Sequence, residues 1–145
     1  KKDFKKYHPS GNLGAKLKTV EDIMLTKEKI PFISENSNMK EALRVITQKK
    51  LGTLIVKNKK NKTTGIITDG QIRRVSQKND NFHMLQIKKI MTKNPIKIDK
   101  EVLAVKALSI MNENKITSLC VYNKPYKSKT IGIIHIHSIL ENNIT

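Results

Sequence analysis

The sequence predicts an α/β (α+β) fold in which one β-α-β-β-α unit occurs twice. The prediction rests on short motifs that recur 65 to 67 residues apart, on apolar residues at helical spacing, and on apolar runs of strand length. The recurring motifs are Ile23-Met24 and Ile90-Met91, Ala42-Leu43 and Ala107-Leu108, Leu54-Ile55-Val56 and Leu119-Cys120-Val121, and Gly65-Ile66-Ile67 and Gly132-Ile133-Ile134. A nearly constant offset with small length changes indicates two copies of one unit.

The two predicted repeats occupy residues 20–80 and 87–143, and residues 1–19 lie outside them. A unit of about 60 residues buries only ~60% of its chain surface on folding and is marginally stable alone. We therefore expect the two repeats to pack across a pseudo-two-fold axis and to share a core. In that arrangement the strand-to-helix junctions of both repeats flank clefts between the two halves.

Each repeat is expected to begin with a short strand, over residues 30–33 in the first copy and 95–98 in the second. A helix follows, because four apolar residues in each copy have the i, i+3, i+4, i+7 spacing of one helix face. These residues are Met39, Ala42, Leu43 and Ile46 in the first copy, and Ala104, Ala107, Leu108 and Met111 in the second. Ser37 is the expected N-cap of the first helix.

A hairpin and a short helix are predicted to complete each repeat. Residues 54–56 and 119–121 are continuous apolar runs that suit buried strands, so Cys120 is expected to be a buried small hydrophobe rather than a nucleophile. A polar loop and a second strand follow in each copy. Short helices over residues 71–76 and 138–142 close the two units.

The chain carries a strong excess of positive charge, with 29 basic and 12 acidic residues and a formal net charge of +17. Lysine accounts for nearly all of it, since Arg44, Arg73 and Arg74 are the three arginines of the sequence. Aromatic residues make up 4% and Trp is absent, so specific nucleic-acid binding is not expected. The lysine-rich segment 57–62 is interpreted as a solvated hairpin loop, with a phosphate-binding patch as the alternative.

Composition also excludes several classes of protein. No apolar run approaches the roughly 18–20 residues that span a bilayer, and the first residues lack the apolar region of a signal peptide. Cys120 is the single cysteine, which excludes an internal disulfide and a multi-cysteine zinc site and fits a reducing, cytoplasmic location. Without an initiator Met, the chain is expected to be a piece of a longer protein.

The repeated unit resembles a CBS domain, and the tandem pair resembles a Bateman module. The matching features are Ile-Met near each start, the Ala-Leu helix, the Leu-x-Val strand, and Gly-Ile-Ile-Thr before a short helix. A second set of motifs is similar to the C-terminal half of arabinose-5-phosphate isomerases, which join a sugar isomerase (SIS) domain to a CBS pair. These motifs are His8-Pro9-Ser10-Gly11-Asn12-Leu13-Gly14, Val20-Glu21-Asp22-Ile23-Met24 and Thr68-Asp69-Gly70-Gln71-Ile72-Arg73-Arg74, with Ser10 departing from the glycine of the family pattern.

The isomerase resemblance implies that residues 1–19 are the tail of an SIS domain that precedes this chain. In the family the histidine of the junction motif lines the active site, and that position is His8 here. A histidine suits the proton transfer of an aldose–ketose isomerisation between ribulose 5-phosphate and arabinose 5-phosphate. Without the remainder of its pocket we expect His8 to be inert, so this chain alone is not expected to be an enzyme.

The CBS resemblance implies a ligand between the repeats, because such pairs commonly hold adenine nucleotides there. The family pattern is Gly-h-h-Thr/Ser-x-x-Asp, where h is apolar, the hydroxyl contacts phosphate and the carboxylate contacts ribose. The first copy has Thr68 but Gln71 in place of the Asp, and the second has His135 and Ser138. Because neither copy is intact, weak or no AMP or ATP binding is predicted.

A different anion fits the residues better. Arg73 and Arg74, with Thr68 and Asp69 at the helix start, are candidate ligands for a phosphate or carboxylate. His135 and His137 share one side of the second strand if that strand continues to residue 137. The resemblance adds a candidate, because these isomerases begin the Kdo branch of lipopolysaccharide synthesis and CMP-Kdo, an end product, carries a phosphate and a carboxylate.

Alternatives remain open for several of these residues. Asp69 has an equal claim as a helix cap, Arg73 and Arg74 as a solvated helix face, and His83 as a surface residue of the linker. No metal or cofactor is expected. At the level of function, a metabolite-sensing module with an attached SIS domain is the main hypothesis. A ligand-free assembly module that forms homo-oligomers and a non-specific polyanion-binding protein are the alternatives.

Overall fold

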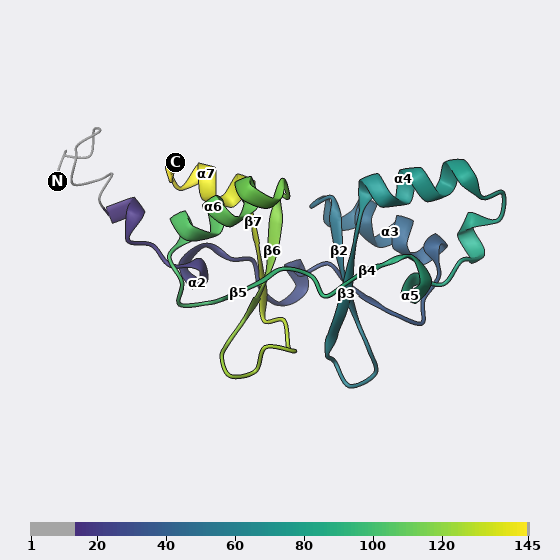
Figure 1. Ribbon diagram of the computed structural model, residues 1–145, viewed down its shortest axis with the longest axis horizontal. Coiled ribbons are helices and arrows are strands. Elements are labelled where there is room, and N and C mark those ends of the chain that lie inside the picture. Colours follow the sequence, from purple (N-terminus) through teal and green to yellow (C-terminus); the bar gives the residue numbers. More distant parts are fainter. Residues whose placement is uncertain (1–13, 145) are drawn as a thin grey trace.

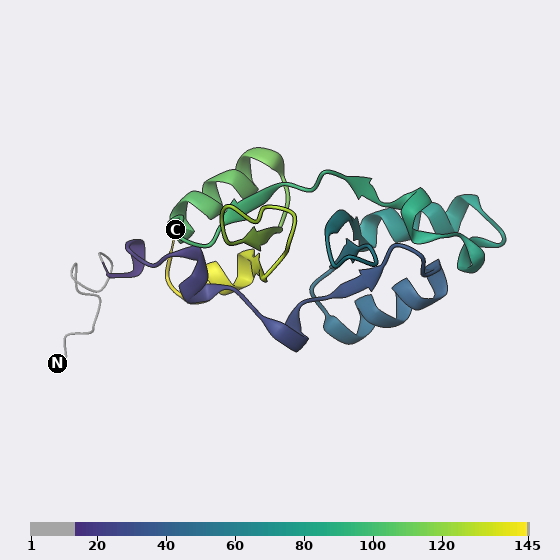
Figure 2. The same ribbon diagram turned by 90° about the horizontal axis from the view of Figure 1, so that it is seen from below.

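The structure is a computed structural model that describes residues 14–144, so His8 and residues 1–13 of the predicted tail lie outside the described part. Two lobes lie side by side along the longest axis, each built from one small sheet and the helices that cover it (Figure 1). Figure 2 shows the same two lobes from below, joined by extended segments of the chain. Within residues 14–144, no helix is both long enough and apolar enough to cross a membrane.

The predicted β-α-β-β-α order occurs twice and confirms the fold class. In the first copy the elements are β1 (Phe32–Ser34), α3 (Met39–Lys49), β2 (Thr53–Lys57), β3 (Thr63–Thr68) and α4 (Asp69–Lys78). In the second copy they are β5 (Lys97–Asp99), α6 (Ala104–Asn114), β6 (Ser118–Tyr122), β7 (Gly132–His135) and α7 (Ile136–Glu141). The remaining short elements are α2 (Val20–Ile23), η1 (Lys27–Lys29), η2 (Phe82–Met84), α5 (Ile87–Ile90) and β4 (Thr92–Lys93).

The three strands of the second sheet have the same topology as the first three strands of the first sheet, to which β4 adds a fourth. β1 and β5 pair in parallel with β2 and β6, which then pair antiparallel with β3 and β7. The registers match as well, because Phe32 lies opposite Ile55 in the first sheet and Lys97 lies opposite Cys120 in the second. The parallel pair in each lobe is joined through α3 or α6, as a β-α-β crossover requires.

Several helices and strands begin at other residues than predicted. Asn38, not Ser37, caps α3, since its side chain accepts a hydrogen bond from the Glu41 N–H at 3.1 Å. β1 and β5 begin two residues later than predicted, after Pro31 and Ile96. α4 begins at Asp69 and α7 at Ile136, both earlier than predicted, because each starts directly where its strand ends. The first residue of a helix or strand is difficult to locate from sequence patterns.

The first segment of each sequence repeat packs on the opposite lobe. Val20 and Ile23 of α2 are buried with Ala104 and Ile139 in the core of the second lobe. The Leu25 N–H donates to the Ile133 carbonyl at 2.8 Å, and the Ile133 N–H donates back at 3.0 Å. The pseudo-equivalent segment does the same in the first lobe, where Ile87 is buried and β4 pairs with β3. This exchange ties the two lobes together.

Two glycines make the exchange possible. A Cβ built on Gly65 would lie 2.7 Å from both Met91 Sδ and the Thr92 carbonyl oxygen. A Cβ built on Gly132 would lie 2.5 Å from Met24 Sδ. Glycine is required at position 65, because a side chain there would overlap the Thr92 backbone, whereas at Gly132 the Met24 side chain would have to move.

A third apolar cluster lies where the two sheets face each other. Ile55 of β2 and Cys120 of β6, which occupy equivalent positions in the repeats, are buried there with Ile30 and Ile133. Burial of each large aliphatic side chain stabilises the fold by about 1.5–3 kcal/mol. The shared core expected of two marginal repeats is thus present, and it borders the candidate site.

Candidate functional site

A cavity of about 150 Å³ lies between the two sheets, beside the shared apolar cluster. The first lobe contributes Thr53, Ile55 and Ile66, and the second contributes Ile116, Ser118, Cys120 and Ile133. The extended segment between β4 and β5 closes it with Thr92, Asn94, Pro95 and Ile96. The walls are mainly apolar, and a few polar groups stand at fixed places, which is the usual composition of a small-molecule site.

The polar groups of the cavity are held by the strand ends. Thr53, at 4% exposed, donates its hydroxyl hydrogen to the Ile67 carbonyl at 3.3 Å. Asn94 has φ 53°, in the left-handed region where asparagine is favoured among non-glycine residues. Ser118 is half-buried on β6. The cavity therefore offers hydroxyl and amide groups but no charged side chain among the residues that line it.

Thr68 and Gln71 stand next to the cavity without lining it. Thr68 pairs with Thr53 across the sheet, and the Gln71 Nε2 donates to the Thr92 hydroxyl at 2.9 Å. The same two side chains form the capping box of α4. The Gln71 N–H donates to Thr68 Oγ1 at 3.3 Å, and the Thr68 N–H donates to Gln71 Oε1 at 3.0 Å. A ligand that uses either side chain has to share it with the helix start.

Asp69 and the two arginines lie farther from the cavity. The Asp69 backbone N–H donates to the Gly52 carbonyl at 3.0 Å, and its carboxylate is exposed beside the α3–β2 turn. Because Thr68 is the N-cap, the structure contradicts the alternative in which Asp69 caps α4. Arg73 is exposed, and Arg74 lines a separate shallow hollow with Gln71 and Lys78. The expected single cleft for Thr68, Asp69 and the arginines is therefore not formed.

At the second junction, the strand ends one residue after the apolar run. β7 stops at His135, whose Nδ1 accepts a hydrogen bond from the His137 N–H at 3.2 Å as the N-cap of α7. The expectation that His135 and His137 share one side of a strand is wrong, because His137 is already helical. The two rings still meet edge to face, with centroids 4.8 Å apart. His137 is exposed and Ser138 is half-buried.

The surroundings of His135 favour its uncharged form. Burial lowers the pKa of His135, and the neighbouring His137 lowers it further, while a backbone hydrogen bond to Leu51 opposes the shift. Since Nδ1 accepts a hydrogen bond, the proton of the neutral ring belongs on Nε2.

The two pseudo-equivalent clefts differ in how they are filled. Pro95 and Ile116 line the cavity on one side, and their counterparts in the repeat are Ile30 and Leu51. Ile30 is 6% exposed and packs into the cluster between the sheets, with Leu51 half-buried against it. Apolar side chains are therefore packed between the sheets at the positions equivalent to Pro95 and Ile116. The cavity beside Thr68 and Gln71 is the candidate site.

Sequence reasoning missed most residues of this cavity. Ile55, Ile66, Cys120 and Ile133 belong to the repeated motifs, but none of them was expected to contact a ligand. Cys120 is buried as expected, and burial raises the pKa of its thiol to about 11. Thr92, Asn94 and Ile96 belong to the segment after Ile90-Met91, which crosses to the other lobe. The repeat offset marks this segment, but nothing in one sequence indicates the lobe on which it packs. In residues 14–144, no three His, Cys, Asp or Glu side chains are grouped to hold a metal ion.

The comparison with protein families decides what kind of module this is. The family model of the CBS domain matches residues 20–78 and 87–144. The chain belongs to the CBS domain family. The two matches make it a tandem CBS pair, with the cavity between the two sheets and the short helix α4 beginning beside it.

Curated relatives of this CBS pair include sugar-phosphate isomerases. It is 37% identical over 139 residues to the arabinose 5-phosphate isomerase KdsD of Salmonella typhimurium, covering 95% of this chain and 42% of the relative. It is 35% identical to KdsD of Escherichia coli over the same shares. An uncharacterized protein of Rickettsia prowazekii is 37% identical over 99% of this chain. The chain spans less than half the length of these relatives.

Solved structures of CBS pairs have the same fold. CBSX2, solved in complex with AMP, has a TM-score of 0.77 at 18% identity, covering 87% of this chain and 96% of that one. A CBS domain pair in complex with 5-methylthioadenosine and S-adenosyl-L-methionine has a TM-score of 0.75 at 22% identity, covering 86% of this chain and 94% of that one. A CBS-domain protein from Agrobacterium tumefaciens has a TM-score of 0.77 at 17% identity, covering 88% and 95%.

Proposed function

We propose that this CBS pair is the regulatory module of an arabinose 5-phosphate isomerase and that it binds a small anionic metabolite between its repeats. The observation that carries the proposal is the cavity between the sheets, bordered by the Thr68–Gln71 junction. The similarity to KdsD over 95% of the chain supports the isomerase parent. The parent would convert ribulose 5-phosphate to arabinose 5-phosphate in its SIS domain, in the cytoplasm, with His8 contributed to that active site.

The proposed mechanism is a difference in affinity between two states of the parent enzyme. A ligand that binds one arrangement of the lobes more tightly shifts the population toward it, and the attached SIS domain responds. The exchanged segments α2 and α5 are suited to this role. Each is buried in one lobe while it belongs to the other repeat, so a change between lobes moves both.

The cavity supports only weak binding of AMP or ATP. Its volume of about 150 Å³ lies below the ~300–1,000 Å³ typical of ligand pockets, so any nucleotide, CMP-Kdo included, has to widen it, and the difference between AMP and CMP-Kdo rests on the polar contacts at the mouth. The position of the family's ribose-binding carboxylate is Gln71, whose amide already bonds to Thr92 and to Thr68. A neutral amide also forms weaker hydrogen bonds to a ribose than a carboxylate does.

CMP-Kdo is the specific ligand that we propose. Its base would enter the mainly apolar cavity, and its phosphate and carboxylate would remain at the mouth near Thr68, where the start of α4 offers backbone N–H groups. We propose that this anionic part contacts Thr68, Gln71 and the more distant Arg73, which were also the contacts predicted from the sequence. His135, His137 and Ser138 lie at the strand-to-helix junction of the second repeat and do not line this cavity, so they are proposed as contacts only for a ligand that binds at that junction.

Calorimetric titration with CMP-Kdo, compared with AMP, tests the proposal directly. A Ser118→Leu variant should fill the cavity and remove CMP-Kdo binding, while Thr117→Leu, on the exposed neighbouring position, should retain it. A ligand that binds the folded chain must also raise its melting temperature. No heat and no melting shift with CMP-Kdo would refute this ligand. In that case a ligand-free homo-oligomerisation role, checked by light scattering, becomes the better explanation.

A further inference from the structure

The two lysine-rich hairpins of the repeats meet at one end of the molecule. The loop between β2 and β3 and the loop between β6 and β7 lie together below the two sheets (Figure 1). The Thr63 N–H donates to the Ser128 carbonyl at 2.7 Å, and the hydroxyls of Thr63 and Thr130 are hydrogen-bonded and buried. These bonds fix the two loops relative to each other.

A hollow of about 520 Å³ lies between these loops, and it shares no lining residue with the cavity between the sheets. Lys60 and Lys62 come from the first loop and Lys129 from the second. Asn61, Asn123 and Ser128 add hydrogen-bonding groups to the same hollow. Its volume is within the range of ~300–1,000 Å³ found for sites that hold small molecules.

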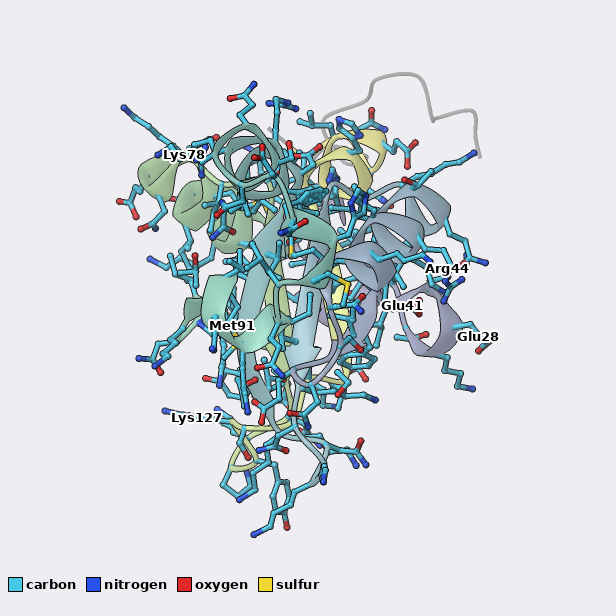
Figure 3. The ribbon with its side chains drawn as sticks, turned by 90° about the vertical axis from the view of Figure 1, so that its right-hand side faces the viewer. Glu28, Glu41, Arg44, Lys78, Met91 and Lys127 are labelled. Atoms are coloured by element: carbon cyan, nitrogen blue, oxygen red, sulfur yellow. The ribbon has the colours of Figure 1, made fainter. Side chains whose placement is uncertain are left out.

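The charge of this hollow is unbalanced. Neither loop contains an Asp or Glu between residues 57 and 63 or between 122 and 131. The ion pairs found in residues 14–144 are Arg44–Glu41, seen in Figure 3, and Lys100–Glu21, and neither uses a loop lysine. Positively charged side chains that line one hollow repel each other, so an anion between them is favoured.

The first loop holds its lysines in a defined arrangement. Asn58 Oδ1 accepts hydrogen bonds from the Lys60 N–H at 2.9 Å and from the Lys62 N–H at 3.0 Å. Asn61 has φ 62°, a left-handed conformation that closes the turn. The backbone from which Lys60 and Lys62 extend is thus fixed by its own hydrogen bonds, which reduces the entropy lost when a ligand binds.

The second loop supplies an aromatic surface, and Lys97 of β5 holds this loop in place. Tyr126 is 68% exposed at the hollow, so its ring is free to cover a planar part of a ligand. Lys97 Nζ donates to the Lys127 carbonyl at 3.1 Å and holds the loop against the sheet. The Lys127 side chain itself extends away from the loops in Figure 3 and is not counted as a ligand.

We propose that the hollow between the two hairpins is a second binding site, for a small molecule that carries a diphosphate or an equivalent multiply charged anion. Lys60, Lys62 and Lys129 neutralise the charge, and the amide and hydroxyl groups of Asn61, Asn123 and Ser128 donate hydrogen bonds to the remaining oxygens. This site is separate from the CBS cavity and does not depend on the proposed isomerase parent.

Calorimetric titration with inorganic pyrophosphate at about 0.1 M salt tests the proposal, because weak attraction to the overall charge is largely screened there. The test variant is the double substitution Lys60→Ala and Lys129→Ala. The matched control is Lys88→Ala with Lys106→Ala, which removes two exposed helical lysines and lowers the net charge equally. Thermal melting of both variants checks that each remains folded.

Saturable 1:1 binding is expected for the wild type and the control, with a loss of about tenfold or more in the loop variant, since two charge-assisted bonds are removed. Equal weakening in both variants, or binding that never saturates, would mean that pyrophosphate responds only to the overall net charge of +17 and would contradict the proposal. If a DNA oligonucleotide requires the two loop lysines while pyrophosphate does not bind, the loops are a nucleic-acid surface and the proposal is wrong.

Discussion

Gln71 donates a hydrogen bond of 2.9 Å from its side-chain amide to the hydroxyl of Thr92. This bond joins the start of α4 in the first repeat to the segment that opens the second repeat and lines the cavity. Gln71 is also the position where the family pattern has a ribose-binding carboxylate. One side chain therefore connects the helix cap, the exchanged segment and the ligand cavity.

Gln71→Asp is expected to raise the affinity for AMP by about tenfold, because a carboxylate makes charge-assisted hydrogen bonds to ribose hydroxyls. Calorimetry with AMP measures the change. Gln77→Asp introduces the same charge on an exposed part of α4 and serves as the control, with no expected gain. An unchanged AMP affinity in Gln71→Asp would show that this position does not face the ligand.

Gly65→Ala is expected to destabilise the fold by about 1–3 kcal/mol, because the added methyl group overlaps both Met91 and the Thr92 backbone. Urea unfolding followed by circular dichroism measures the loss. Gly14→Ala is the matched control, since a Cβ there meets nothing within 4 Å. Equal stability of Gly65→Ala and the wild type would argue against the close packing of the exchanged segment on β3.

Thr68→Ala removes the hydroxyl that accepts the Gln71 N–H and should cost about 1 kcal/mol of unfolding free energy. Thr68→Ser keeps the hydroxyl and should retain most of the stability. The two variants are compared by urea unfolding at neutral pH. If Ala and Ser at position 68 are equally stable, the capping box contributes little, and Thr68 is then free to contact a ligand.

Stability is expected to fall as the pH drops from about 7.5 through and below the ordinary histidine pKa of 6.5, because the pKa of His135 is lowered in the folded chain. The unfolded chain binds a proton at a higher pH than the folded chain does. The stabilising contribution is therefore complete above the ordinary histidine pKa and is lost as pH falls through the folded value. Urea unfolding across this range measures the slope.

His135→Asn should remove most of that slope, while its amide oxygen still accepts the His137 N–H. His83→Gln is the control, because His83 is exposed and stacks on Phe82. Backbone hydrogen bonds from Lys124 and Glu101 lower the pKa of Asp99, so the titration of Asp99 changes the stability only at more acidic pH. A slope that persists in His135→Asn would assign the pH dependence to other groups.

Much of the fold was predictable because its signals are local. The i, i+3, i+4, i+7 spacing of Met39, Ala42, Leu43 and Ile46 identified α3, and the apolar run 54–56 identified β2. The strand-to-helix junction at His135 was not predictable in this way, because a β-branched run followed by His-Ile-His fits a continuing strand as well as a helix start. There the N-cap bond from the His137 N–H decided in favour of the helix.

Short-range patterns in the sequence are enough to predict the duplication and the order of elements in each copy. The exchange of α2 and α5 between the lobes, the packing of Ile30 between the sheets and the meeting of the two lysine loops are seen only in the folded chain. Periodicity and turn chemistry act over a few residues, whereas side-chain volumes and charges brought together across the pseudo-two-fold come from positions far apart in the chain.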